Sequence, residues 1–452
     1  MRFAWQNMLR LLIASLMTVC TFQPAGSLAR EYLDIYSTGI VKFPVAVPDF
    51  EYLDSGDDLS GMVRKITDVL SNDLRISGIF DVRAPGLNVD LLKDEKFGDH
   101  DAVNYSQWVS LLKVDGLVKG GYRYRRDPKT KSTLLSIDVY FYDLTIKSPI
   151  LGKRYEAGVE DARRIVHRIG NDIVYKLTGE RGIFDTKIAF SSKRGKYKHL
   201  YVIDFDGANL RQMTRGPFID FSPTWSPDGK YLAFTSISPA DSSVKLNALS
   251  LHDGQKKLIS GFPGLNTAAA WSADGQNLAF VLTKDGNPEI YVQDRRGTLT
   301  RLTKNWSIDT EPTWSPDGKW IAFVSDRAGS PQIYIMDEKG GNVRRLTYEG
   351  NYNTSPAWSP RGDKIVYTSL NNGDIDLCLI SPDGSGNRFM TRGAGRNESP
   401  SWSPDGRLIA FFSNRLNTSQ IFVMEANGSN VRRLTMSKGE FSDPAWSPRL
   451  DQ

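Results

Sequence analysis

A Trp-Ser-Pro-Asp-Gly motif recurs at a nearly constant interval through most of the chain. The segment 223–234, PTWSPDGKYLAF, returns five more times with substitutions. The Trp of each copy gives its position: Trp225, Trp271, Trp314, Trp358, Trp402 and Trp446. The intervals by subtraction are 46, 43, 44, 44 and 44 residues. A fixed period of this length indicates a repeat architecture in which each copy is one structural unit.

Each copy predicts four short antiparallel strands. The Trp lies in the first strand, and Ser-Pro-Asp-Gly forms a tight turn after it. This sequence favours a turn because Pro presets φ, Asp bonds its own backbone and Gly takes the last position without steric cost. A second strand follows, such as Tyr231–Thr235, then a third, such as IYVQD from Ile290. The fourth ends in Arg-Leu-Thr. Four short strands per period are typical of a propeller blade.

The order of these strands predicts how the ring closes. The first copy of the second strand, Lys187–Ser192, has no Trp strand before it, and the last Trp strand, Pro444–Pro448, has nothing after it. We therefore expect the C-terminal strand to complete the first blade, whose other strands come from Lys187–Thr214. The result is a six-bladed β-propeller over residues 187–452 without an open edge.

The residue before each Trp is small in every copy: Thr224, Ala270, Thr313, Ala357, Ser401 and Ala445. We expect this strand to lie nearest the axis, where the blades crowd together, and the Trp to wedge between neighbouring blades. The motif residues are accordingly interpreted as scaffold.

The N-terminus has the features of an export signal over residues 1–29. Arg2 and Arg10 charge its start, and the apolar stretch Leu11–Cys20 is too short to span a bilayer. Small residues at Ser27 and Ala29 predict cleavage before Arg30. A lipoprotein signal acylated at Cys20 is disfavoured, because Val19 stands where a small residue is expected.

Residues 30–186 lack the repeat and alternate helical and strand patterns, which predicts a small α/β domain. The expected helices are 59–76, 105–112 with Asn104 as its cap, and 159–177. The expected strands are 44–50, 79–83, 116–124, 134–142 and 150–156. The whole chain is thus predicted to be multidomain, α/β followed by all-β. The arm 30–39 before the first strand is either a segment that pairs with a sheet edge, a frayed start or a first strand of the domain.

Catalytic and cofactor signals are scarce. Removing Arg2 and Arg10 with the leader lowers the formal charge from +5 to +3, which is too mild to favour nucleic acid. The four histidines are interpreted as solvated or packed, because no two lie at metal-ligand spacing: His100, His167, His199 and His252. Asp204–Gly207 is interpreted as a hairpin turn rather than a calcium loop. We expect no cofactor and no metal. No Gly-x-Ser-x-Gly motif occurs.

Two other classes of function stay open. An exported propeller enzyme, a peptidase or a polysaccharide-degrading enzyme, would have to use carboxylates near the channel, such as Asp309, Glu311 and Glu398. A small ligand in the channel would instead make contact near Thr224 and Thr313.

The loops that join each Arg-Leu-Thr strand to the next Trp strand differ sharply between copies, although the scaffold is uniform. A rigid scaffold with varied loops on one face is typical of a binding site. Trp306 and Tyr352 are apolar enough to anchor a partner. The predicted contact residues on this loop face are Leu265, Asn266, Thr267, Trp306, Asp309, Thr310, Glu311, Tyr352, Asn353, Arg396 and Glu398.

The leader, the small α/β domain and the blades built on Pro-x-Trp-Ser-Pro-Asp-Gly…Ile-Ala-Phe…Arg-Leu-Thr together resemble the TolB family, periplasmic components of the Tol–Pal system of Gram-negative bacteria. Segments Glu311–Trp314 and Pro444–Pro448 match the family well. The resemblance implies a periplasmic, non-enzymatic adaptor that supports outer-membrane integrity and constriction during cell division. Its propeller loops would bind the peptidoglycan-associated lipoprotein Pal. The mature N-terminal arm would bind TolA, through Glu31, Tyr32, Leu33, Asp34, Ile35 and Tyr36. Other outer-membrane lipoproteins or porins are further expected partners.

Overall fold

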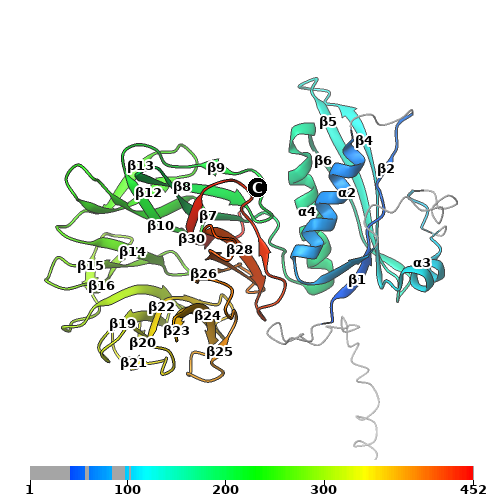
Figure 1. The fold of residues 1–452 in the computed structure, drawn as a ribbon. Helices are drawn as coiled ribbons and strands as arrows, with labels where there is room; N and C mark the ends of the chain where they lie inside the picture. Colours follow the sequence, from blue (N-terminus) through cyan, green and yellow to red (C-terminus); the bar gives the residue numbers. More distant parts are fainter. Residues whose placement is uncertain (1–40, 56–60, 84–96, 101–102, 451–452) are drawn as a thin grey trace, which may run out of the picture. The chain divides into compact units, whose positions relative to one another are not determined.

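The computed structural model describes residues 41–55, 61–83, 97–100 and 103–450. The predicted leader, 1–29, and the arm, 30–39, lie outside these residues. All described residues belong to one unit, Ile35–Gln452. It contains an N-terminal domain followed by a β-propeller (Figure 1).

The N-terminal domain is built on one mixed sheet. Its strands are β1 (Phe43–Ala46), β2 (Glu51–Tyr52), β3 (Phe80–Arg83), β4 (Gly116–Arg126), β5 (Thr133–Asp143) and β6 (Ser148–Gly158). The order is β3-β1-β4-β5-β6, with β2 also paired to β4. β1 is parallel to β3 and β4, whereas β4, β5 and β6 are antiparallel. The strand predicted at 44–50 ends at Ala46, because Pro48 has no N–H to donate to a neighbouring strand.

Helices cover this sheet as the sequence predicts. α2 (Met62–Ile76) and α4 (Ala162–Thr178) lie side by side against one face (Figure 1). Ile165, Ile169 and Ile173 follow one another at four-residue steps and are buried, because such spacing returns to one helix face. α4 begins at Ala162 because residues 159–161 form the 3-10 turn η2 (Val159–Asp161). No helix among the described residues is long and apolar enough to cross a membrane.

The other face of the sheet is covered in part by α3 (Tyr105–Leu112), whose Trp108 is buried beside Leu117 and Tyr142. The Asn104 side chain accepts a hydrogen bond from the backbone N–H of Gln107 at 3.1 Å, which confirms the predicted cap.

The propeller consists of short antiparallel strands in consecutive sheets. Four of the sheets have four strands each, in the orders β14-β15-β16-β17, β18-β19-β20-β21, β22-β23-β24-β25 and β26-β27-β28-β29. Their bounds are β14 (Asn266–Trp271), β15 (Asn277–Leu282), β16 (Glu289–Asp294), β17 (Leu299–Arg301), β18 (Asp309–Trp314), β19 (Trp320–Ser325), β20 (Gln332–Asp337), β21 (Arg344–Arg345), β22 (Tyr352–Trp358), β23 (Ile365–Asn371), β24 (Asp374–Ile380), β25 (Arg388–Phe389), β26 (Asn397–Trp402), β27 (Leu408–Ser413), β28 (Gln420–Glu425) and β29 (Arg432–Arg433).

The remaining sheet has eight strands and contains both ends of the propeller chain. Its strands are β7 (Lys187–Arg194), β8 (Tyr197–Asp204), β9 (Arg211–Gln212), β10 (Ile219–Trp225), β11 (Tyr231–Ile237), β12 (Val244–Ser250), β13 (Lys256–Ser260) and β30 (Glu440–Trp446). β30 pairs antiparallel with β7, which is the pairing predicted for the C-terminal strand. A single parallel pair, Ile219 with Lys198, joins β10 to β8.

The repeated Trp side chains pack against neighbouring repeats. The indole Nε1–H of Trp225 donates to the carbonyl of Ala445 at 2.9 Å, and that of Trp402 donates to the carbonyl of Ala357 at 2.9 Å. Both acceptors are small residues that precede another Trp. The Ser226 hydroxyl donates to Asp228 Oδ1 at 2.6 Å within its turn. The interpretation of the motif as scaffold is therefore confirmed.

Candidate partner-binding face

The first strand of each repeat has a buried side chain near its start, five residues before the Trp, and this side chain is polar in five of the six repeats. This position holds Asp220, Asn266, Asp309, Asn353 and Asn397, and at the last repeat Phe441. All five polar side chains are at most 1% exposed. The Asn266 amide donates to the carbonyls of Val244, Phe262 and Gly264, and the Asn353 amide donates to the carbonyl of Glu349. These side chains hold the preceding loop onto the strand.

Asp309 has the strongest set of such contacts. Arg327 Nη2 donates to both of its carboxylate oxygens at 2.9 Å, and the Asn305 amide donates to Oδ2 at 2.7 Å. Asn305 directly precedes Trp306, so the carboxylate fixes the loop that carries the indole. Asn266, Asp309 and Asn353 were predicted as contact residues. Because these three side chains are buried, they lie beneath the loops and not at the loop surface.

A bulge follows in each of these strands. The residue three before each Trp has φ near +50°: Ser222 (48°), Ala268 (53°), Glu311 (51°), Ser355 (50°), Ser399 (52°) and Asp443 (55°). The strand register shifts at the same places. Non-glycine residues rarely adopt this left-handed conformation, and its recurrence in every repeat indicates that the surrounding strands impose it.

Glu311 lies at one of these bulges and contacts the next repeat. Its carboxylate accepts a hydrogen bond from the backbone N–H of Ser355 at 2.6 Å. Burial raises the pKa of the Glu311 carboxyl, and the charges of Asp443 and Glu398 raise it further. Three acidic side chains from separate repeats therefore lie within electrostatic reach of one another. The Ser355 side chain also forms a hydrogen bond with this carboxylate, and that bond opposes the effect of burial on the pKa of Glu311.

Large apolar side chains stand exposed on the loops above these anchors. Trp306 is 101% exposed, and Tyr352 and Leu265 are 47% and 40% exposed. The same loops also expose Phe262, Ile308 and Tyr348, which the sequence-based prediction missed. The sequence could have indicated these three residues, because large apolar residues are unusual in loops whose sequences differ between repeats. Exposed aromatic side chains over a rigid scaffold suit a protein interface.

The remaining predicted contact residues lie at the edges of the same loops. Arg396 and Glu398 form an ion pair at 2.6 Å. The Thr267 hydroxyl lies 2.9 Å from that of Thr235, and Thr310 is half-buried next to Asp309. The structure thus brings the exposed Trp306 and Tyr352 onto the ends of neighbouring strands, whereas the six arm residues Glu31–Tyr36 lie outside the described residues.

The closing sheet contributes a hollow lined by basic and aromatic residues where β7, β8 and β30 meet. It encloses about 300 Å³, and its lining includes Lys193, Lys196, Tyr197, Phe412 and Phe441. Lys198 at its edge pairs with Asp443 at 2.9 Å. This hollow adjoins the start of β30, so it lies at the same ends of the inner strands as the loops described above.

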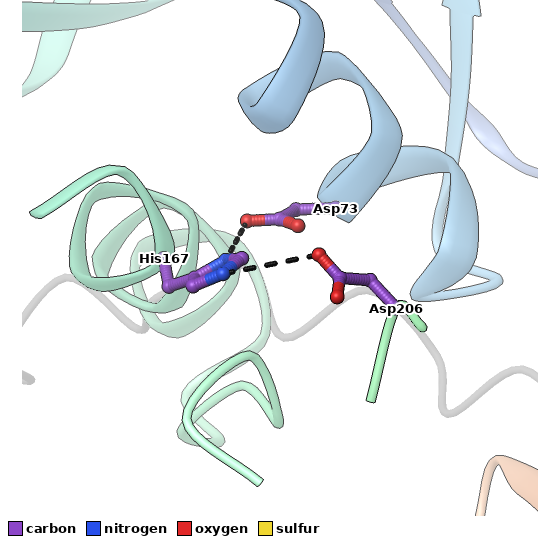
Figure 2. A group of neighbouring side chains, drawn as sticks. All are labelled: Asp73, His167 and Asp206. Atoms are coloured by element: carbon purple, nitrogen blue, oxygen red, sulfur yellow. Dashed lines mark hydrogen bonds and ion pairs between the residues drawn. The ribbon is translucent and has the colours of Figure 1, made fainter. Parts of the chain in front are cut away.

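A separate polar cluster, absent from the predicted site, joins Asp73, His167 and Asp206 (Figure 2). His167, on α4, is only 5% exposed, and its Nδ1 lies 2.7 Å from Oδ2 of Asp73 on α2. Its Nε2 faces Asp206, in the turn after β8, at 3.8 Å. His167 is thus packed, as predicted, but it also has charged partners. Sequence spacing could not reveal them, because Asp73 lies 94 residues away.

The arrangement of this cluster does not suit a metal ion. The carboxylates of Asp73 and Asp206 face different ring nitrogens of His167, and a single ion takes one imidazole nitrogen. Asp206 is also engaged by the guanidinium of Arg163. These contacts describe a chain of hydrogen bonds and ion pairs that runs from α2 through α4 to the propeller turn.

Comparison with known proteins agrees with the fold. The profile of the TolB amino-terminal domain matches residues 31–141, and that of the TolB beta propeller domain matches residues 174–450. A Tol-Pal system protein TolB of Desulfosudis oleivorans is 36% identical over 301 residues, which are 66% of this chain and 65% of that protein. The match therefore spans slightly less than two thirds of that relative.

Solved structures show the same architecture. TolB from Acinetobacter baumannii superposes with a TM-score of 0.77 at 26% identity, over 90% of this chain and 97% of that chain. A chain from a nidogen/laminin complex reaches a TM-score of 0.50 at 11% identity, over 59% of this chain and 100% of that chain. The second likeness concerns the fold alone.

Proposed function

Because this chain belongs to the TolB family, we propose that it is a non-enzymatic adaptor of the Tol–Pal system that binds the lipoprotein Pal through the loop face of its propeller. The loop face comprises the loops that carry Leu265, Trp306, Tyr352 and Arg396. The observation that carries the proposal is the full exposure of the Trp306 indole on a loop whose base is fixed by Asp309. A preformed aromatic anchor loses little conformational entropy on binding.

The burial of some predicted residues changes which of them we propose to touch the partner. Trp306, Tyr352 and Leu265 touch the partner directly, together with Ile308 and Tyr348. Asn266, Asp309 and Asn353 act by holding the loops. Thr267, Thr310, Glu311, Arg396 and Glu398 form the more polar edge of the contact, where side chains discriminate between partners more than they add affinity.

We further propose the organisation that this role requires. The leader 1–29 directs the chain to the periplasm of a Gram-negative bacterium, and the arm 30–39 binds TolA. The N-terminal domain spans 30–186 and the propeller spans 187–452. Pal, TolA and other outer-membrane lipoproteins or porins are its protein partners, and through them it supports outer-membrane integrity and constriction at division.

The proposed propeller has six blades. The eight-stranded sheet counts as two blades, β30-β7-β8-β9 and β10-β11-β12-β13, because only the pair of Ile219 with Lys198 links them. The four remaining sheets supply the other blades. Six Trp strands, one for each blade, support this count.

The test is calorimetric titration of the mature protein with the soluble domain of Pal from the same organism. We expect binding in the micromolar range or tighter. Replacing an interface aromatic anchor by alanine costs about 2 kcal/mol or more, so Trp306→Ala is expected to weaken binding by at least about thirtyfold. Tyr352→Ala is expected to weaken it less, because about half of that side chain is already covered.

The matched control is Tyr175→Ala, which removes an exposed aromatic side chain from α4. It is expected to bind Pal as the unaltered protein does. Unchanged affinity of a folded Trp306→Ala, Tyr352→Ala double variant would move the site away from the loop face. Absence of binding by the unaltered protein would refute the assignment of Pal as partner.

A further inference from the structure

The cluster of Asp73, His167 and Asp206 has more acceptors than donors at its centre. An uncharged imidazole carries one N–H, whereas carboxylates stand opposite both of its nitrogens (Figure 2). Only one of the two contacts can therefore be a hydrogen bond. The structure has this form: Nδ1 is bonded to Asp73 at 2.7 Å. Nε2 is buried 3.8 Å from Asp206 and has no hydrogen-bond partner among the residues that the structure describes.

One added proton corrects this excess of acceptors, whether it binds the imidazole or Asp73. An imidazolium donates from both nitrogens, to Asp73 and to Asp206. If the proton instead binds Asp73, that carboxyl donates to Nδ1 and the single imidazole N–H turns to Asp206. In both cases each contact then has a donor and an acceptor, and the buried Nε2 gains the hydrogen-bond partner that it lacks.

We propose that His167 is an acid-sensitive latch, in which uptake of one proton by the Asp73–His167–Asp206 cluster fastens helices α2 and α4 to the propeller turn after β8. This inference goes beyond the proposed function and does not depend on Pal or TolA. The contacts of the cluster come from three separate elements, so a change at one imidazole acts on the attachment of the N-terminal domain to the propeller.

The guanidinium groups around the cluster stay charged while the cluster takes up its proton. On α4, the guanidinium of Arg163 pairs with Asp206, and Arg432 on β29 lies within electrostatic reach of the same carboxylate. Guanidinium groups keep their protons at all relevant pH values. The Phe205 ring packs edge-on against His167 at 5.4 Å between ring centroids and excludes water on that side.

The environment of Asp73 also favours uptake of a proton by the cluster. Burial raises the pKa of its carboxyl from 3.8 to about 6, against the opposing effect of the hydrogen bond and charge of His167. A raised carboxyl pKa means that the folded protein holds more protons than the unfolded chain between these values. The stability that this proton contributes is present at lower pH and is lost as the pH rises through about 6.

The test is hydrogen–deuterium exchange of the mature protein at about pH 5.5 and about pH 7.5, with labelling times scaled for the intrinsic exchange rate and with a chelator present. We expect the peptides covering 162–178 and 204–208 to exchange more slowly at the lower pH. One additional net hydrogen bond corresponds to about tenfold, or ~1.4 kcal/mol. In His167→Phe the pH effect is expected to vanish from the peptide covering 204–208, because no imidazole is then present to bond Asp206.

Asp206→Asn separates the latch from a general loss of folding. The amide of this variant can donate to the unprotonated Nε2, and its oxygen can still accept from Arg163. Slow exchange is therefore expected at both pH values. His199→Gln is the matched control, since His199 is a buried histidine of β8 without an ion pair among the described residues, and it is expected to keep the pH effect.

Three results would overturn the proposal. One is an equal exchange rate at both pH values in the unaltered protein. Another is a pH effect on the peptide covering 204–208 that persists in His167→Phe. Slower exchange that requires added Zn²⁺ instead of acid would also overturn it, in favour of a metal site.

Discussion

At the residue scale, the buried polar side chain near the start of five of the six inner strands is the feature that makes the loops rigid. Asp309 shows this most clearly, because its carboxylate accepts from Arg327 and from Asn305. The sequence indicated this position as a place of functional interest. It could not distinguish a loop anchor from a contact residue, since both are polar and both precede the Trp by a few residues.

Asp309→Ala is expected to lower the free energy of unfolding by about 2–3 kcal/mol, because it leaves Arg327 and Asn305 without their shared partner. Denaturant unfolding measures this change. Trp306→Ala, in the same loop, is the control and should change stability by less than about 0.5 kcal/mol, since its side chain is already solvated. Equal stability of the two variants would show that Asp309 is not an anchor.

A second residue-scale prediction concerns the charge of Asp73. Asp73→Asn removes a buried carboxylate whose pKa is raised to about 6. It should increase the free energy of unfolding at about pH 7.5 by roughly 1–3 kcal/mol and have little effect near pH 4.5. Urea unfolding at both pH values tests the sign. Destabilisation at the higher pH would mean that the ionised Asp73–His167 bond outweighs the cost of burial.

At the element scale, local signals were sufficient for most strands and turns. The Ser-Pro-Asp-Gly turn is specified by four adjacent residues, and the structure confirms it. The helix at 162–178 follows from the four-residue spacing of its isoleucines. Bulges and clusters were not predictable in this way. The bulge at Glu311 needs its neighbour strand, and Asp309 meets Arg327 18 residues away.

The closing strand gives the element-scale prediction. Deleting residues 437–452 removes β30 and exposes the edge of β7, which pairs with it along its length. We expect this truncation to aggregate or to lose its cooperative thermal transition, because an exposed hydrophobic edge strand promotes association. Removing residues 451–452 alone is the control. A monomeric truncated protein with an unaltered transition in light scattering and circular dichroism would contradict the role of β30.

At the scale of the whole molecule, the packing between repeats is uniform and builds the propeller, whereas the varied loops form the proposed binding face. Trp225, Trp314 and Trp402 join neighbouring repeats through the same carbonyl contact, and the loops above them differ in length, charge and apolar content. Sequence repetition therefore predicted the architecture well. It could not predict which loop residues point outward, because exposure depends on the buried side chains beneath them.

The central claim, that Pal binds the loop face, is tested most directly by photocrosslinking in living cells. A photoreactive amino acid, benzoylphenylalanine, replaces Trp306 in one strain and Tyr175 of α4 in another. We predict a crosslinked product with Pal from position 306 and none from position 175. A crosslink from Tyr175 with none from Trp306 would contradict the account and would place the partner on the N-terminal domain.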